Sequence, residues 1–335
     1  MVVVVPVHDG GDDVGRCLAA LVAAGQPVEA ILVVDDASRD GAALDAAREH
    51  GSKYERLADG PHGPARARNA GARMASADGA DAFLFVDADV VVHADAIERF
   101  RTLLDACPDM AAAFGSYDDE PPAPGWVSQY KNLLHHRMHQ RGSIDACTFW
   151  SGCGVVRRAP FEALDGFDER FDDATIEDVD LGLRLTDAGY RVRLCPEILC
   201  THLKAWSVLG WLRTDIFKRA LPWSRLLHER GQGVPDNLNL GLRERVSAAL
   251  ALLVALGTLL LPFAPSPALI VACPAAAVFV FLQRDLLGFF ARHRGLRFAI
   301  AAAFMHLCYF VYSSAVFVGV RLAAPFGGAP RPHRS

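Results

Sequence analysis

The sequence lacks the marks of several protein classes. Its eight cysteines are scattered along the 335 residues and form no C-x-x-C pair. This favours reduced, mostly buried thiols in a cytosol-facing protein over a disulfide framework. The net charge is −5, so no basic excess supports general nucleic-acid binding, and no nucleic-acid partner is expected. The apolar run Val2–Val5 is short and has no basic residue before it, so we do not expect a signal peptide.

Apolar residues make up 52% of the chain, but they are unevenly spread. As far as about Leu242, apolar runs of strand length alternate with charged helical stretches. This order predicts an α/β domain with a mostly parallel central sheet and helices on both faces. We place the domain at residues 1–205, with strands at Met1–Val7, Ala30–Val34 and Ala82–Val86.

The C-terminal third has the composition of membrane helices. Long apolar runs occupy 246–264 and 298–320, and a shorter one occupies 267–283; a bilayer crossing needs about 20 residues. We therefore expect about three spans within 243–323, followed by a tail, 324–335. The arginines before the first span and between the last two would be cytoplasmic if the α/β domain is cytoplasmic, as the positive-inside rule requires. We therefore expect a multi-pass protein of the cell membrane with a cytoplasmic α/β domain. Arginines in the tail argue mildly against three full crossings. Buried helices of a soluble domain are the alternative.

The segment 206–242 carries aromatic and basic residues interleaved directly before these runs. This pattern is typical of an amphipathic helix at the membrane interface, and an ordinary packing helix is the alternative. Basic residues here can bind a phosphate, either of a lipid or of a leaving diphosphate.

Carboxylates follow the predicted strands, where open α/β sheets bind ligands. Asp35 and Asp36 follow the second strand, where a carboxylate can accept hydrogen bonds from a nucleobase or ribose. Asp87 and Asp89 follow the run 82–86, and their hard oxygens suit Mg²⁺ or Mn²⁺ that bridges a diphosphate. Taken alone, such a D-x-D pair is more often a solvated turn.

Two further candidates lie later in the chain. Glu177 and Asp178 begin a predicted amphipathic helix, where they are either capping charges or functional carboxylates. His202 follows a strand-like stretch, and a single histidine is more often structural than a ligand.

Six ordered stretches together resemble the family 2 glycosyltransferases of the GT-A fold. They are VVVVPVH (2–8), VVDDASRD (33–40), PARARNAG (64–71), FVDAD (85–89), GFDE (166–169) and EDVDL (177–181). The resemblance covers about residues 1–205. It implies a membrane-anchored, inverting enzyme of bacterial type that uses a nucleotide sugar, with a UDP-sugar as the first expectation.

The resemblance also implies roles for individual residues. Those that bind the nucleotide sugar would be Pro6, His8, Asp35, Asp36, Arg66, Asn69 and Asp87. Asp89 and His202 would hold Mg²⁺ or Mn²⁺ on the diphosphate. Asp178, beside Glu177, would be the general base. On the acceptor or diphosphate side the residues would be Gly152, Lys218, Arg219 and Trp223. Inversion needs one base and one Lewis acid, and adjacent carboxylates raise each other's pKa toward a useful value.

The acceptor is expected to be membrane-associated, a lipid or a lipid-linked glycan. Processive polysaccharide synthases of this family carry a Q-x-x-R-W motif, but here Pro222 stands where the arginine should precede Trp223. This disfavours processive synthesis. The alternatives are a processive synthase after all, or a non-catalytic membrane scaffold that has kept the fold.

Overall fold

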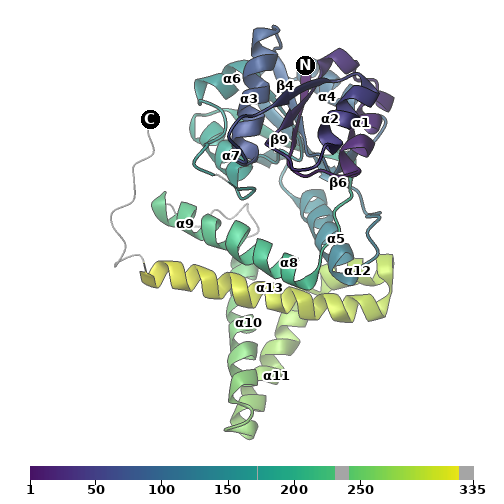
Figure 1. Ribbon diagram of the computed structural model, residues 1–335. Helices are drawn as coiled ribbons and strands as arrows, with labels where there is room; N and C mark the ends of the chain where they lie inside the picture. Colours follow the sequence, from purple (N-terminus) through teal and green to yellow (C-terminus); the bar gives the residue numbers. More distant parts are fainter. Residues whose placement is uncertain (172, 231–240, 324–335) are drawn as a thin grey trace. The chain divides into compact units, whose positions relative to one another are not determined.

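The computed structural model describes residues 1–171, 173–230 and 241–323 and divides the chain into two units, Met1–Trp206 and Ser207–Ser335 (Figure 1). The predicted tail, 324–335, and residues 231–240 of the predicted interfacial segment lie outside the described residues.

A nine-stranded sheet forms the centre of the first unit, in the order β3-β2-β1-β4-β8-β6-β9-β5, with β7 paired to β9. The strands are β1 (Val2–Val7), β2 (Ile31–Asp35), β3 (Lys53–Arg56), β4 (Ala82–Val86), β5 (Val90–Val92), β6 (Met110–Tyr117), β7 (Asp145–Ala146), β8 (Cys153–Arg157) and β9 (Arg191–His202). Strands β5, β7 and β8 run against the direction shared by the others. The predicted α/β class with a mostly parallel sheet is confirmed.

Helices cover both faces of this sheet, as the strand–helix–strand order predicts. They are α1 (Asp13–Ala23), α2 (Ala42–His50), α3 (Pro64–Ala77), α4 (Ala96–Ala106), α5 (Trp126–Arg141), α6 (Arg158–Ala163) and α7 (Glu177–Asp187), with a 3-10 turn η1 (Val28–Ala30). Apolar residues of α1, α2 and α4 form one core cluster with the sheet, and those of α3, α6 and α7 form the other. Because β2 and β4 lie between these layers, all their residues are buried.

The second unit is helical. Its elements are α8 (Val208–Arg213), a π-helix η2 (Thr214–Ala220), α9 (Leu221–Glu229), α10 (Leu242–Leu260), α11 (Pro265–Leu282), α12 (Arg284–Arg294) and α13 (Leu296–Ala323). Within the described part of the chain, two helices, α11 and α13, are long and apolar enough to cross a membrane. Helix α10 packs along α11 (Figure 1), but its first turn carries charged side chains and it ends before the predicted run 246–264 does. The count of about three spans stays a prediction.

Candidate active site

Several of the predicted site residues lie where the parallel strands of the first unit end. Asp87 and Asp89 directly follow β4, and the backbone N–H of Asp87 donates to the carbonyl of Gly152 at 3.1 Å. Gly152 lies in the turn before β8, where a β-carbon would approach the Trp150 ring to 2.5 Å. The antiparallel pairing of β8 with β4 therefore places this turn beside the D-x-D pair.

Arg68 links two of the acidic clusters, and sequence reasoning missed it. Its Nη1 donates to Glu177 Oε1 and its Nη2 to Asp87 Oδ1, both at 2.7 Å. The arginine is only 3% exposed, and a buried guanidinium needs such partners to offset its lost hydration. Arg66, which was predicted to contact the sugar or diphosphate, lies two positions earlier on an exposed face of α3, and that contact stays a prediction. The helical spacing of the buried alanines of α3 was the signal that could have shown that Arg68, and not Arg66, lies on the buried face of this helix.

Asp178 stands at the start of α7, with its carboxylate directed to the same region. Its Oδ2 accepts from the backbone N–H of Ser151 at 3.1 Å, and its Oδ1 accepts from the N–H of Val179 at 2.8 Å. Burial raises the pKa of Asp178 to about 6, with further repulsion from Glu177; Arg68 and the backbone donors oppose the rise. Asp178 therefore changes protonation near pH 6.

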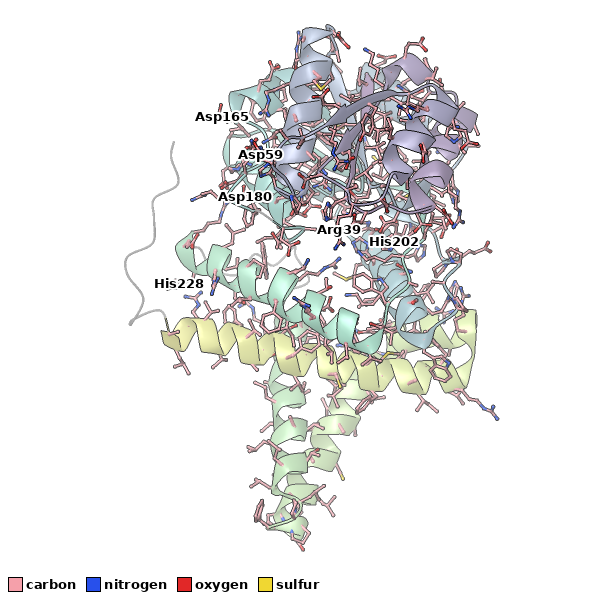
Figure 2. All side chains as sticks on the ribbon, in the orientation of Figure 1. Arg39, Asp59, Asp165, Asp180, His202 and His228 are labelled. Carbon is pink, nitrogen blue, oxygen red and sulfur yellow. The ribbon has the colours of Figure 1, made fainter. Side chains whose placement is uncertain are left out.

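Asp89 faces His202 across the β5–β9 pair. Val90 lies opposite His202 in that antiparallel register, and the Oδ2 of Asp89 lies 3.4 Å from the Nε2 of His202 and 4.0 Å from the Nζ of Lys204. Burial alone would raise the pKa of Asp89, but the hydrogen bond and charge of His202, with the charge of Lys204, hold it below its usual value. Figure 2 labels His202 at this position.

Asp89 and His202 are the residues that could hold a divalent cation. In ranges 1–171, 173–230 and 241–323, no set of three His, Cys, Asp or Glu side chains is arranged as a complete metal site. One carboxylate oxygen and one imidazole nitrogen suit Mn²⁺ or Mg²⁺ when oxygens of a diphosphate and water fill the other positions. The donor set thus fits a metal that arrives with a phosphorylated substrate.

The acidic pair Asp35 and Asp36, at the end of β2, is engaged within the protein. Asp35 accepts from the Ser38 N–H, the Tyr54 hydroxyl and the Arg56 guanidinium at 2.6–2.8 Å. Asp36 accepts from the backbone N–H groups of His62 and Gly63.

Other predicted residues of the nucleotide-sugar set lie around this pair. The ring of His8 contacts the Asp36 carbonyl at 2.8 Å, and Pro6 pairs with Val34 in the sheet. Arg39, labelled in Figure 2, ties this loop to Asp9 after β1. Contacts within the protein therefore hold the loops after β1 and β2 in place. Contact of these residues with a nucleoside stays a prediction.

Asn69 lies inside the protein. Its side-chain oxygen accepts from the Phe167 N–H at 2.9 Å, and its Nδ2 donates to the Phe167 carbonyl and to Glu169. Asn69 thereby holds the GFDE loop against α3, and its predicted contact with the sugar or diphosphate stays a prediction. Lys218, Arg219 and Trp223 lie in η2 and α9 of the second unit, and their acceptor-side role likewise stays a prediction.

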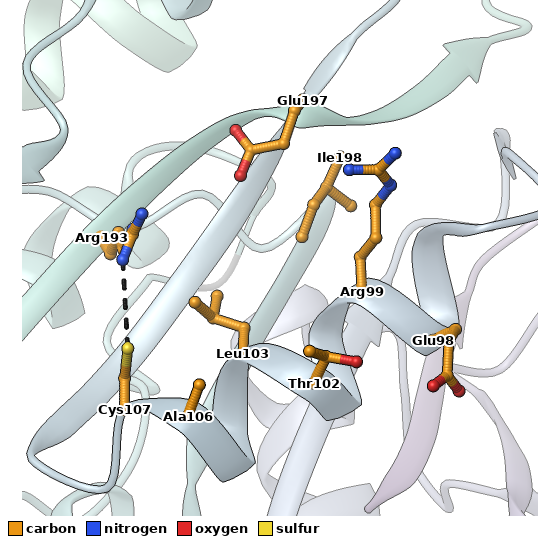
Figure 3. A pocket seen from close by; sticks show the side chains of 9 residues that line it. All are labelled: Glu98, Arg99, Thr102, Leu103, Ala106, Cys107, Arg193, Glu197 and Ile198. Carbon is orange, nitrogen blue, oxygen red and sulfur yellow. Dashed lines mark hydrogen bonds between the residues drawn. The ribbon is translucent and has the colours of Figure 1, made fainter.

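A separate pocket of about 330 Å³ lies on α4 and β9 (Figure 3). Leu103 and Ile198 contribute to its wall, and Arg193 approaches the sulfur of Cys107 at 4.0 Å. Its lining residues differ from those predicted for the site.

Comparison with known proteins gives one family and one fold. Residues 2–165 match the model of Glycosyl transferase family 2. The mannosyltransferase PcManGT from Pyrobaculum calidifontis, solved with GDP-Man and Mn²⁺, is 18% identical with a TM-score of 0.56; the match covers 95% of this chain and 86% of that one. At this identity the likeness shows the fold alone, and it agrees with the predicted GT-A fold.

Two further structures resemble the chain more weakly. GalNAc-T7 with UDP, GalNAc and Mn²⁺ is 15% identical, with a TM-score of 0.49 over 68% of this chain and 47% of that one. TarS 1-349 of S. aureus with UDP-GlcNAc is 14% identical, with a TM-score of 0.48 over 96% and 91%. Both are too distant in structure to add to the fold assignment. No curated protein sequence matches the chain.

Proposed function

Since the N-terminal unit of this chain is a family 2 glycosyltransferase of the GT-A fold, we propose that the protein transfers a sugar, with inversion, from a nucleotide sugar to a membrane-associated acceptor. One observation carries the proposal. The turn before β8 joins the two carboxylate clusters of the site, since the Ser151 N–H donates to Asp178 and the Gly152 carbonyl accepts from the Asp87 N–H. Within these clusters burial raises the pKa of Asp178 to about 6, whereas at Asp89 burial is outweighed by His202 and Lys204, which hold the pKa below its usual value. Such a pair separates the role of a base from that of a permanently ionised group.

In this proposal Asp178 takes the proton of the acceptor hydroxyl. The acceptor oxygen then bonds to the anomeric carbon as the bond from that carbon to the diphosphate oxygen breaks, and the diphosphate leaves with the electron pair. Asp89 stays ionised at neutral pH and, with His202, would hold a divalent cation. When bound, the cation would neutralise the charge that develops on the leaving diphosphate.

Arg68 supports both halves of the site. Its bonds to Asp87 and Glu177 join the loop after β4 to the start of α7. The guanidinium also offsets part of the repulsion that Glu177 exerts on Asp178, so that the base is ionised at pH 7. Because these side chains are anchored on α3 and α7, the base and the D-x-D pair keep a fixed spacing.

The membrane part of the proposal has separate support. Sequence 246–282 contains no Asp, Glu, Lys or Arg, and α11 and α13 have the length and hydropathy of spanning helices. Large apolar side chains of the second unit, among them Leu259, Phe263 and Phe281, are more than half exposed. Such an exposed apolar surface is suited to the hydrocarbon interior of a membrane. We expect the protein to stay in membranes washed with carbonate, and recovery in the wash would contradict a spanning anchor.

A donor panel tests the enzymatic proposal. The full chain in detergent is incubated with Mn²⁺ and UDP-, GDP- or dTDP-sugars, and release of the nucleoside diphosphate is measured. GDP-sugars are included because the Pyrobaculum structure holds GDP-Man. We expect slow hydrolysis of one donor class and its loss in Asp89→Ala.

Asp81→Asn is the matched control, since this carboxylate precedes β4 at its other end and its side chain is 90% exposed. It should hydrolyse the donor like the wild type. Hydrolysis of no donor at all would overturn the proposal and favour the non-catalytic scaffold. Undiminished hydrolysis by Asp89→Ala would overturn the role proposed for Asp89.

A further inference from the structure

We propose that Asn132 is a positioning residue for His202: its side-chain oxygen keeps the proton on Nδ1 and so leaves Nε2, the nitrogen that faces Asp89, for the cation. This inference rests on the proposed function, because it requires His202 to bind the cation. Neither the sequence motifs nor the comparisons point to Asn132.

The two nitrogens of the His202 ring have separate partners. Nδ1 lies 2.6 Å from Oδ1 of Asn132, and Nε2 lies 3.4 Å from Oδ2 of Asp89. Asn132 comes from the middle of α5 and is 2% exposed, and His202 is 8% exposed. Water therefore has little access to the Nδ1 side of the ring, and Asn132 would keep a proton on Nδ1 when Nε2 exchanges its contact with Asp89 for the cation.

A third side chain fixes the plane of the ring. Tyr117, the last residue of β6, stacks on His202 with ring centroids 4.5 Å apart and planes 7° apart. Stacking holds the plane of the imidazole but leaves open a half-turn flip that exchanges the positions of its two edges. The hydrogen bond to Asn132 opposes that flip, because the flip would turn Nδ1 away from the amide oxygen.

An amide side chain at position 132 lowers the stability of the fold, so its presence calls for a role of its oxygen. Its Nδ2 is buried and has no hydrogen-bond partner among the residues that the structure describes. An unpaired buried donor destabilises the fold, and a leucine of similar volume would avoid that cost. The contact with His202 supplies a reason for an amide here: a neutral imidazole can bind a metal through Nε2 only when Nδ1 carries the proton.

The test compares four variants of the full chain in detergent. His202→Ala removes the proposed metal ligand itself. Asn132→Leu removes the acceptor, and Asn132→Asp keeps an acceptor but cannot donate. Ser128→Ala is the matched control, because Ser128 is another buried polar residue of α5 whose hydroxyl accepts from the Trp206 N–H instead. Mn²⁺ with inorganic pyrophosphate is the probe, because Asp89 and His202 leave the other coordination positions to diphosphate oxygens and water. The affinity for Mn²⁺ is measured by electron paramagnetic resonance, and the coupling of a histidine nitrogen to the bound ion is measured by electron spin-echo modulation.

We expect Asn132→Leu to bind Mn²⁺ about 10–100-fold more weakly, the usual effect of losing such a partner, and to weaken the nitrogen coupling. Asn132→Asp should bind Mn²⁺ with an affinity within about threefold of that of the wild type. This result would show that the side chain at position 132 acts as a hydrogen-bond acceptor and not as a donor. Ser128→Ala should bind like the wild type.

Three outcomes would overturn the inference. Unchanged affinity and coupling in Asn132→Leu would show that Asn132 does not position the ring. Weak binding in Asn132→Asp would mean that the amide donates to Nδ1, and a loss in Ser128→Ala equal to that in Asn132→Leu would reduce Asn132 to a packing residue. If the wild type itself shows no nitrogen coupling, or His202→Ala leaves it unchanged, the proposed metal role of His202 fails, and that result is distinct from the other three.

Discussion

The pH dependence of sugar transfer should report the protonation of Asp178. With a pKa of about 6, this carboxyl is about nine-tenths ionised at pH 7 and about one-tenth ionised at pH 5. Because only the ionised form can take the acceptor proton, kcat/KM should fall roughly tenfold from pH 7 to pH 5. Asp178→Asn, which cannot accept a proton, should abolish transfer at every pH.

Glu177→Gln tests the cause of the raised pKa. Glu177 repels the Asp178 anion, after burial the second cause of the rise, while its Oε1 accepts from Arg68. Glutamine keeps an acceptor for Arg68 but removes the negative charge, so the Asp178 anion becomes easier to form. The acid limb of the profile should therefore move to lower pH.

The assay is kcat/KM for the donor identified by the panel, measured from pH 5 to pH 8 on the full chain, with Asp81→Asn as the control. A rate that is flat down to pH 5 would refute Asp178 as the titrating base. Movement of the limb to higher pH in Glu177→Gln would refute the electrostatic explanation.

The same pKa makes a prediction for stability. A carboxyl pKa raised from 3.8 to about 6 means that the folded state holds this proton more tightly than the unfolded chain does. The ionised carboxylate therefore destabilises the fold above pH 6, by at most about 3 kcal/mol, and the effect disappears as the pH falls below 3.8. Asp178→Asn should raise the Tm at pH 7 and leave it nearly unchanged at pH 4; a lower Tm at pH 7 would contradict this.

Three further predictions concern the frame of the site and its cation. Arg68→Leu leaves Glu177 and Asp87 without their partner, so the protein should lose about 3–5 kcal/mol of stability in thermal denaturation; an unchanged Tm would mean that the bridge contributes nothing. In Gly182→Ala a β-carbon would stand 2.0 Å from the Phe149 nitrogen, so α7 must shift and sugar transfer should become slower. Gly15→Ala is the control, because nothing among the described residues lies within 4 Å of its β-carbon, and it should keep the activity of the wild type. EDTA should stop sugar transfer and added Mn²⁺ should restore it, and full turnover without divalent metal would remove the cation from the mechanism.

Local features of the sequence were enough to predict the α/β layer structure. The run 82–86 is apolar at every position because β4 lies between two helical layers, and the carboxylates directly after it lie where the strand leaves the core. The raised pKa of Asp178 was also foreseeable in direction from the adjacent Glu177. The structure shows that burial, which no neighbour in sequence reveals, is the larger cause.

Residue type and periodicities of a few residues were sufficient to predict which chemical groups this protein carries and at which strand ends they stand. Which of these groups meet depends on the fold. Arg68 reaches Glu177 across 109 positions of sequence, and Asp89 meets His202 because β5 pairs antiparallel with β9 in a particular register. The partners of a buried charge, and the histidine nitrogen left for a cation, depend on such contacts between distant segments. Composition and local pattern do not contain them, because the sheet register that creates them is set by the packing of the whole unit.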